Sequence, residues 1–415
     1  MPDRTIYLDH SATTPVDARV AEALTRSLTE NFGNPSSVHG FGQQARAAVD
    51  RARREVAALI NAKPNEIIFT SGGTEANNLA IRGICEASAN RHIVTSAIEH
   101  PSVRGVCDAF EQRGWEVTRL PVYENGIVRV EDVRAALRPD TVLVTVMLAN
   151  NEIGTIQPAR EIGELVRERR TNGQKHLYFH TDAVQAAGRM LLNVDELGCD
   201  LLTMSAHKLY APKGVGALYV RRGVRLVGQN IGGHQERERR AGTENVSGIV
   251  AFGAAAKLAR EELRERTTHD AELRDRFERK VIAVIPDIVL NGDRNRRLPH
   301  LSNISFRYIE GEGLLINLDL QGVAVSTGSA CSSGTLEPSP VIRALGVDDE
   351  IARGSIRFSF GKDNTDADID YTVEVLAQAV ERLRSLSPLN KPQMITDNTD
   401  SALLSHVQRS SRSSS

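Results

Sequence analysis

One lysine of this chain stands where its amine could form a covalent bond with an aldehyde cofactor. Lys208 closes the tetrapeptide Ser205-Ala206-His207-Lys208, directly after the apolar run of residues 201–204. Asp182 follows the preceding apolar run, residues 177–180. Proteins that hold pyridoxal phosphate use a lysine for its aldehyde and an acidic group for its ring nitrogen. A lysine before a glycine-containing turn is also ordinary surface chemistry, so this interpretation depends on the rest of the chain.

Polar residues follow five β-rich runs of the chain, each at the point where the run ends. The runs are residues 67–70, 93–96, 142–148, 177–180 and 201–204. Together with a further run at 216–220, they alternate with helical patterns such as 75–87, 103–113 and 159–170. This alternation predicts a mainly parallel sheet covered by helices on both faces. Ligands bind beyond the carboxyl ends of such strands. Any one polar cluster fits plain turn chemistry, but five on one edge predict a binding site.

The segment Ser71-Gly72-Gly73-Thr74 suits a phosphate group. It opens a helical pattern, where free N–H groups and the helix dipole attract anions and the glycines allow close approach. A glycine-containing helix cap explains the segment equally well, and the Lys-Ser/Thr of a P-loop does not follow. Ser205 and His207 could add phosphate contacts and His100 could stack on a ring, although each is also a common loop residue. Asp182 likewise fits a helix N-cap.

Arg357 and Cys331 are the candidates for substrate contact in the second half of the chain. Arg357 alternates with the apolar residues of an expected strand. Its planar guanidinium could bind a carboxylate, although an arginine facing solvent is the commoner case. Cys331 stands among serines and glycines, where it has little to pack against, whereas Cys85, Cys107 and Cys199 lie in or beside apolar patterns. The wide spacing of the cysteines argues against a zinc knuckle or a disulfide framework.

Length and composition exclude several classes of protein. A chain of 415 residues fits two or three domains. Its 40% hydrophobic and 25% charged residues are typical of a soluble globular protein. The net charge of −2 gives no general attraction to nucleic acid or to anionic membranes. The N-terminus lacks the apolar core of a signal peptide, and no apolar stretch is long enough to span a bilayer. We therefore expect a cytoplasmic protein.

A second, smaller unit is expected after the β-rich region. A charged helical pattern at residues 257–279 predicts a solvent-exposed connector. The tail after residue 388 has too little apolar content to pack and is predicted to be disordered. Within the smaller unit, strands are predicted at 288–290, 304–306, 323–326 and 355–360, and a closing helix at 366–386.

With these residues and motifs, the chain resembles the cysteine desulfurases of the NifS/IscS type, which are fold-type I pyridoxal-phosphate enzymes of the class V aminotransferase family. The resemblance covers residues 7–388, and the matching segments are 7–14, 32–37, 70–78, 180–185, 205–208, 240–245 and 326–339. It implies an α/β fold with a large domain, built on a mainly parallel seven-stranded sheet flanked by helices, and a smaller α+β domain. The implied bounds are 16–259 for the large domain, 1–15 with 260–388 for the small domain, and 389–415 for a disordered tail.

The same resemblance implies a role for each candidate residue of the site. The residues on the pyridoxal ring would be Lys208, Asp182, Gln185 and His100. The residues on its phosphate would be Gly73, Thr74, Ser205 and His207, with Thr243 of the partner subunit in a homodimer. The residues on the substrate carboxylate would be Asn151 and Arg357. Cys331 would be the nucleophile, in a segment that resembles the subgroup with a long mobile cysteine loop, and His100 and Lys208 would act beside it in catalysis. No metal is expected.

The implied reaction removes sulfur from L-cysteine. It leaves L-alanine and a persulfide on Cys331, which passes to an acceptor such as an iron–sulfur scaffold or a thiolation enzyme. The sequence leaves the acceptor open. Asp9-His10-Ser11 replaces the more usual Asp-Asn-Ala of the family, which leaves the preference between cysteine and selenocysteine open as well.

Two other functions fit parts of the sequence. An aminotransferase or selenocysteine lyase of the same fold type is the nearest alternative, and Cys331 argues against transamination because that reaction needs no thiol. A non-catalytic docking protein that retains the fold is the other. The complete set of Lys208, Asp182, His100 and Cys331 argues against it.

Overall fold

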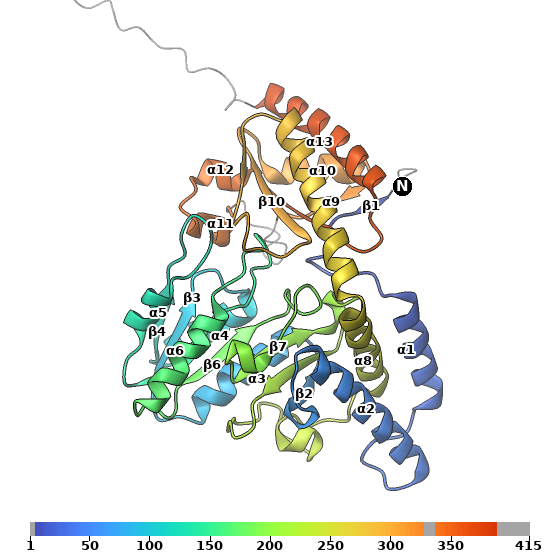
Figure 1. Ribbon diagram of the computed structural model, residues 1–415, viewed down its shortest axis with the longest axis vertical. Coiled ribbons are helices and arrows are strands. Elements are labelled where there is room, and N and C mark those ends of the chain that lie inside the picture. The colour runs from blue at the N-terminus through green and yellow to red at the C-terminus, as the bar shows by residue number, and fades with distance from the viewer. Residues whose placement is uncertain (1–4, 328–336, 388–415) are drawn as a thin grey trace, which may run out of the picture.

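A seven-stranded sheet organises the larger part of the molecule (Figure 1). The computed structural model describes residues 5–327 and 337–387, so the predicted cysteine loop around Cys331 and the predicted tail lie outside the described residues. The strands run in the order β2-β8-β7-β6-β5-β3-β4, and all are parallel except β8, which is antiparallel to both neighbours. Their bounds are β2 Ile67–Thr70, β3 His92–Ser96, β4 Glu116–Leu120, β5 Thr141–Thr145, β6 Tyr178–Asp182, β7 Leu201–Ser205 and β8 Gly216–Val220.

Helices cover both faces of this sheet, and each face has its own apolar core. Successive side chains of a strand point to opposite faces, so Ile68 packs in one core while its neighbours Ile67 and Phe69 pack in the other. The helices of this part are α1 Ala18–Glu30, α2 Gly40–Leu59, α3 Gly73–Glu86, α4 Pro101–Gln112, α5 Val130–Ala136, α6 Ala159–Thr171, α7 Val194–Leu197 and α8 Val246–Glu261. Short 3₁₀ turns are η1 Pro64–Glu66, η2 Ala206–Lys208 and η3 Gln235–Glu238.

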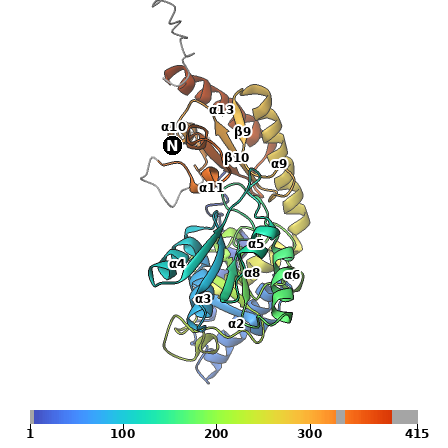
Figure 2. The same ribbon diagram turned by 90° about the vertical axis from the view of Figure 1, so that its left-hand side faces the viewer.

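A smaller α+β unit lies beyond the sheet, and α9 runs into it from the end of α8 (Figure 2). Its antiparallel sheet has the order β12-β10-β9, and β1 pairs in parallel with β11 beside it. A third apolar core fills this unit, with Phe277, Phe306 and Phe358 among its members. The elements are β1 Ile6–Tyr7, α9 Leu263–Val284, β9 Ile288–Leu290, β10 Leu301–Phe306, α10 Gly311–Leu320, β11 Val323–Ala324, α11 Pro340–Ala344, α12 Asp349–Arg353, β12 Ser355–Ser359 and α13 Asp366–Leu386.

The seven-stranded α/β sheet agrees with the expected fold, but some strand bounds were wrong and one strand was missed. The strand predicted at 142–148 ends at Thr145, and the strand predicted at 177–180 extends to Asp182. The edge strand β4 was missed, because its charged and partly exposed residues do not form an apolar run. The domain bounds remain a prediction.

The charged pattern at 257–279 is not one exposed helix. The helical region is divided at Glu262 into α8 and α9. Leu273, Phe277 and Val281 of α9 are buried in the core of the smaller unit, because their spacing of four residues places them on one helix face. The sequence analysis missed this apolar face because arginine and glutamate dominate the rest of the helix.

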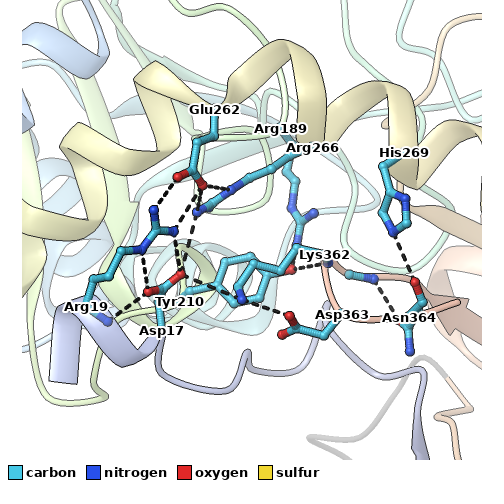
Figure 3. Close-up of polar contacts among 11 residues, drawn as sticks. Asp17, Arg19, Arg189, Tyr210, Glu262, Arg266, His269, Lys362, Asp363 and Asn364 are labelled. Carbon is cyan, nitrogen blue, oxygen red and sulfur yellow. Dashed lines mark hydrogen bonds and ion pairs between the residues drawn. The ribbon is translucent and has the colours of Figure 1, made fainter.

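Charged side chains at the start of α9 join the two units (Figure 3). Glu262 accepts hydrogen bonds from Arg19 of α1 and from Arg266 of α9. Asp17, the N-cap of α1, also accepts from Arg19, and its carboxylate lies 3.7 Å from the Lys362 amine of the smaller unit. The start of α1 is thereby tied to α9 and to the segment after β12.

Tyr210 lies at the centre of this junction (Figure 3). The cationic groups of Arg189, Arg266 and Lys362 lie 5.5, 5.2 and 5.6 Å from its ring centroid. Its hydroxyl oxygen accepts the Lys362 backbone N–H at 3.0 Å. Arg189 also forms a buried ion pair with Asp270 of α9. Such contacts constrain the geometry of the junction, because removing one member of a buried ion pair leaves an uncompensated charge and lowers the stability of the fold.

The substitution Asp270→Ala tests the junction. It leaves the Arg189 guanidinium buried without a counter-ion, and we expect the free energy of unfolding to fall by about 3–5 kcal/mol in urea titrations followed by circular dichroism. Glu164→Ala is the matched control, because its pair with Arg160 on α6 is exposed, and it should change stability by less than about 0.5 kcal/mol. Equal effects of the two substitutions would contradict this account of the junction.

Candidate active site

A cavity of about 650 Å³ lies at the carboxyl ends of the parallel strands. The polar segments that follow β2, β3, β5, β6 and β7 all contribute to its wall, as the parallel topology predicts. Arg357 of β12 closes it on the side of the smaller unit, together with Glu337, Pro338, Pro340, Val341 and Arg343. The sequence-predicted residues that line it are Gly73, Thr74, His100, Asn151, Asp182, Gln185, Ser205, His207, Lys208 and Arg357. Thr243 is exposed and lies outside the described lining, and Cys331 lies outside the described residues.

The Lys208 amine is held by an N-terminal segment to which the sequence had assigned no residue of the site. Residues 9–17, here called the N-terminal strap, pass from the smaller unit to α1. Lys208 Nζ donates to the Ser11 and Ala12 carbonyls of this strap at 2.5 and 2.6 Å. Thr14 donates its N–H and hydroxyl to the His207 carbonyl, and its oxygen accepts the Tyr210 N–H. The strap therefore fixes the lysine and the turn that carries it.

The Asp182 carboxylate is oriented by two donors. Asn77 Nδ2 of α3 donates to one oxygen at 2.7 Å, and the Val184 N–H donates to the other at 2.9 Å. The second contact closes a turn and not a helix, so the helix N-cap that the sequence also allowed for Asp182 was wrong. Asp182 thus caps its turn and lines the cavity at once. Asn77 was missed as a supporting residue, although the segment 70–78 that resembles the family contains it.

Two histidines of the cavity wall favour their neutral forms. Burial lowers the pKa of His100, whose Nδ1 accepts the Ser102 N–H at 3.1 Å and so caps α4. Burial, followed by the nearby charges of Lys208 and Lys213, lowers the pKa of His207 to about 4. A neutral ring at position 100 can stack on an aromatic ligand, and a neutral ring at position 207 can form a hydrogen bond with an anion.

The start of α3 offers the close backbone approach that a phosphate requires. A Cβ atom on Gly73 would lie 2.9 Å from Val184 Cγ2 and 3.5 Å from Ser205 Cβ. Among the described residues, no side chain caps this helix, so its first N–H groups are available to an anion. The Ser71 N–H, which precedes the helix, donates to Glu75 Oε2 at 2.7 Å.

These residues fit pyridoxal phosphate. The cavity has the volume of an ordinary cofactor site. Its wall combines the Lys208 amine, an oriented carboxylate at Asp182 and an uncapped helix start at Gly73. An amine for the aldehyde, an acid for the ring nitrogen and N–H groups for the phosphate are the groups that this cofactor needs.

Arg357 is buried, so the solvent-facing alternative for this residue was wrong. Its exposure is 3%. Nη1 donates to the Asn151 carbonyl at 2.9 Å and Nη2 donates to Asp9 Oδ1 at 2.7 Å. Nε has no hydrogen-bond partner among the described residues. A guanidinium fixed on two sides in a cavity wall is suited to a carboxylate ligand.

Comparison with known proteins identifies the family. The profile of Aminotransferase class-V matches residues 6–372. The chain belongs to this family. It is 51% identical over 387 residues to a protein named cysteine desulfurase IscS from Dictyoglomus turgidum, covering 93% of this chain and 97% of the relative. The α/β fold expected of this family is therefore confirmed.

Solved structures of NifS-like proteins have the same fold as this chain. A NifS-like protein superposes with a TM-score of 0.85 at 35% identity, over 92% of this chain and 100% of that one. A structure titled SspA in complex with cysteine superposes with a TM-score of 0.75 at 33% identity, over 86% and 99% of the two chains.

Glu99 is a buried acid of the cavity wall to which the sequence gave no role. Its Oε1 accepts from Ser96 Oγ at 2.6 Å and from the Met147 N–H at 2.8 Å. Its Oε2 has no hydrogen-bond partner among the described residues. Burial raises the pKa of Glu99 to about 8, and Asp182 adds to this shift. The side chain is therefore largely protonated at neutral pH.

The pH dependence of stability tests the state of Glu99. The folded protein keeps a proton that the unfolded chain releases above the ordinary pKa of 4.5, so this group lowers stability as pH rises toward about 8. Glu99→Gln retains the acceptor for Ser96 and Met147 but cannot titrate. Between pH 6 and pH 8, urea unfolding should show wild type losing roughly 2 kcal/mol relative to the variant. A pH-independent difference would contradict a protonated Glu99.

Proposed function

We propose that this protein is a cysteine desulfurase, which removes sulfur from L-cysteine and leaves L-alanine and a persulfide on Cys331. One observation carries the proposal: the cavity of a class-V aminotransferase brings the Lys208 amine, the Asp182 carboxylate and the Arg357 guanidinium together. Relatives that share half of the sequence are named cysteine desulfurases.

Different residues of the cavity wall would bind different parts of pyridoxal phosphate. Lys208 would hold its aldehyde, Asp182 would hold its ring nitrogen, and His100 and Gln185 would contact its ring. The start of α3, with Gly73 and Thr74, would hold the phosphate together with Ser205 and His207. When bound, this cofactor supplies an electron sink for the α-carbon of an amino acid. Lys208 takes the α-proton of the substrate and later returns a proton, a general-base role for an amine whose direction is fixed by the strap carbonyls.

Arg357 and Asn151 hold the carboxylate of L-cysteine, with the Arg357 guanidinium oriented by Asp9 and the Asn151 carbonyl. The Cys331 thiolate attacks the substrate sulfur. The S–S bond forms as the bond between sulfur and Cβ breaks, and the electron pair left on Cβ takes up a proton to give the methyl group of alanine. The sulfur, now a persulfide, leaves for a thiol of an acceptor protein such as an iron–sulfur scaffold or a thiolation enzyme.

A homodimer is the assembly that fits the surface best. Apolar side chains of α1, α2 and their connection are exposed, and the Phe32 and Phe41 rings lie 5.1 Å apart. Their exposed fractions are 61% at Leu28, 69% at Phe32, 89% at Val38 and 58% at Phe41. An apolar patch of this kind marks a protein interface. Thr243, exposed in its own chain, would then reach the phosphate of the partner subunit.

No described helix has both the length and the apolar character needed to cross a membrane. A cytoplasmic location remains our prediction.

Cys331→Ser tests the nucleophile. We expect the purified variant to keep the visible absorption of bound pyridoxal phosphate while alanine formation from L-cysteine falls by at least about 10³-fold. Cys85→Ala, which changes a buried cysteine of the sheet core, is the control and should retain activity. Desulfuration by Cys331→Ser at the wild-type rate would remove the assignment, and amination of the cofactor without alanine release would favour an aminotransferase.

Phe41→Asp tests the dimer. A charge in the apolar patch should yield monomers in light scattering, and the cofactor should bind about 10- to 100-fold more weakly once the hydrogen bond from the Thr243 of a second subunit is lost. Leu386→Asp, an equally exposed apolar position at the end of α13, should leave the dimer intact. A dimer that survives Phe41→Asp would place the interface elsewhere.

A further inference from the structure

Described residues on either side of the Cys331 segment contact the wall of the cavity. Before it, Ser326 pairs with Arg357: the Arg357 N–H donates to the Ser326 carbonyl at 2.6 Å, and the Ser326 N–H donates back at 3.3 Å. After it, Ser339 Oγ donates to Glu152 Oε2 at 2.5 Å. The first contact lies within the smaller unit, whereas the second is made to the large sheet.

Glu152 is rigidly placed for this contact. It follows Asn151 after β5, lines the cavity and is only 7% exposed. Its N–H donates to Asn150 Oδ1 at 2.8 Å, and its carbonyl accepts from Asn303 Nδ2 of β10 at 3.0 Å. Its main chain is thus held from both units, and its side chain has no part in the reaction proposed above.

Ser339 is itself held by the main chain that follows it. Its oxygen accepts the N–H groups of Val341 and Ile342 at 3.1 and 3.4 Å and so caps α11. Both capped residues are buried in the core of the large sheet. The hydroxyl proton is the remaining hydrogen-bonding capacity of this side chain, and it is used for Glu152.

Chain geometry links this contact to the thiol. Cys331 precedes Ser339 by eight residues, so Ser339 is a fixed point of the chain that is close in sequence to the thiol. Pro338 and Pro340, on either side of Ser339, line the cavity. A shift of Ser339 relative to Asn151 on the large sheet would therefore change where the Cys331 segment is anchored, and with it the approach of the thiol to the substrate sulfur.

We propose that Glu152 is a positioning residue for sulfur transfer. By accepting the Ser339 hydroxyl, it holds the chain that follows the Cys331 segment in a fixed position relative to the residues that bind the substrate. This inference rests on the proposed function. Glu152 does not touch the reacting atoms, and its effect is on the alignment of thiol and substrate sulfur. Misplacement of reacting groups by about 1 Å can lower a rate about 10²-fold.

Glu152→Ala and Glu152→Gln, compared in the holoenzyme, test the proposal. The alanine variant removes the acceptor, and we expect alanine formation from L-cysteine to fall about 10- to 100-fold. The glutamine variant keeps an oxygen for Ser339 and should retain most of the wild-type rate. Exchange of the α-proton of L-alanine with D₂O, followed by NMR, requires Lys208 but no thiol, and it should stay within about twofold of wild type in both variants, because fold and cofactor binding are intact.

Cys331→Ser is the reference in the same two assays, since it should lose alanine formation and keep exchange. If Glu152→Ala forms alanine at the wild-type rate, the inference is overturned while the proposed function stands. If Glu152→Ala loses exchange together with alanine formation, Glu152 supports the fold or the cofactor, and the inference is again overturned. If the wild-type holoenzyme itself forms no alanine, the proposed function fails first.

Discussion

The hydrogen bonds between the N-terminal strap and the turn of Lys208 are the constraint on which the site depends. The strap carbonyls of Ser11 and Ala12 accept from the lysine amine, and Thr14 closes the turn by bonding His207 and Tyr210. Without these contacts a long, flexible amine at the end of β7 would have many conformations. With them, its nitrogen is fixed at the carboxyl edge of the sheet, where the other polar segments converge.

The same strap couples the site to the placement of the two units. Asp9, at its start, holds Arg357 of β12, and Asp17, at its end, lies among the cations around Tyr210. Arg357 in turn donates to the Asn151 carbonyl on the large sheet. A change in the angle between the units would therefore disturb both the lysine and the carboxylate-binding arginine. The junction consists of ion pairs and hydrogen bonds, of which the Arg189–Asp270 pair is buried, and the directionality of such contacts fixes geometry more strictly than apolar packing does.

Several polar side chains have a local structural role and a role in the site at once. Asp182 bonds its own turn while it faces the cavity, His100 caps α4, and Ser339 caps α11 while it donates to Glu152. A local structural role of such a residue does not compete with a functional one. A cap fixes the rotamer of the side chain, which is what a binding site requires of its ligands.

The sequence by itself determined which polar segments follow the strands of the large sheet. Apolar runs marked β2, β3, β5, β6, β7 and β8, and since carboxyl ends of parallel strands share an edge, the polar residues after them had to meet. It could not reveal β4, whose charged residues lie at a sheet edge, or the break at Glu262. Only the tertiary structure decided the contacts that orient the site: Lys208 with Ser11, Glu152 with Ser339, and Arg357 with Asp9 join residues 197, 187 and 348 positions apart. Such pairs leave no periodic signal in a sequence, because they depend on how separate elements pack and not on the local repeat of helix or strand.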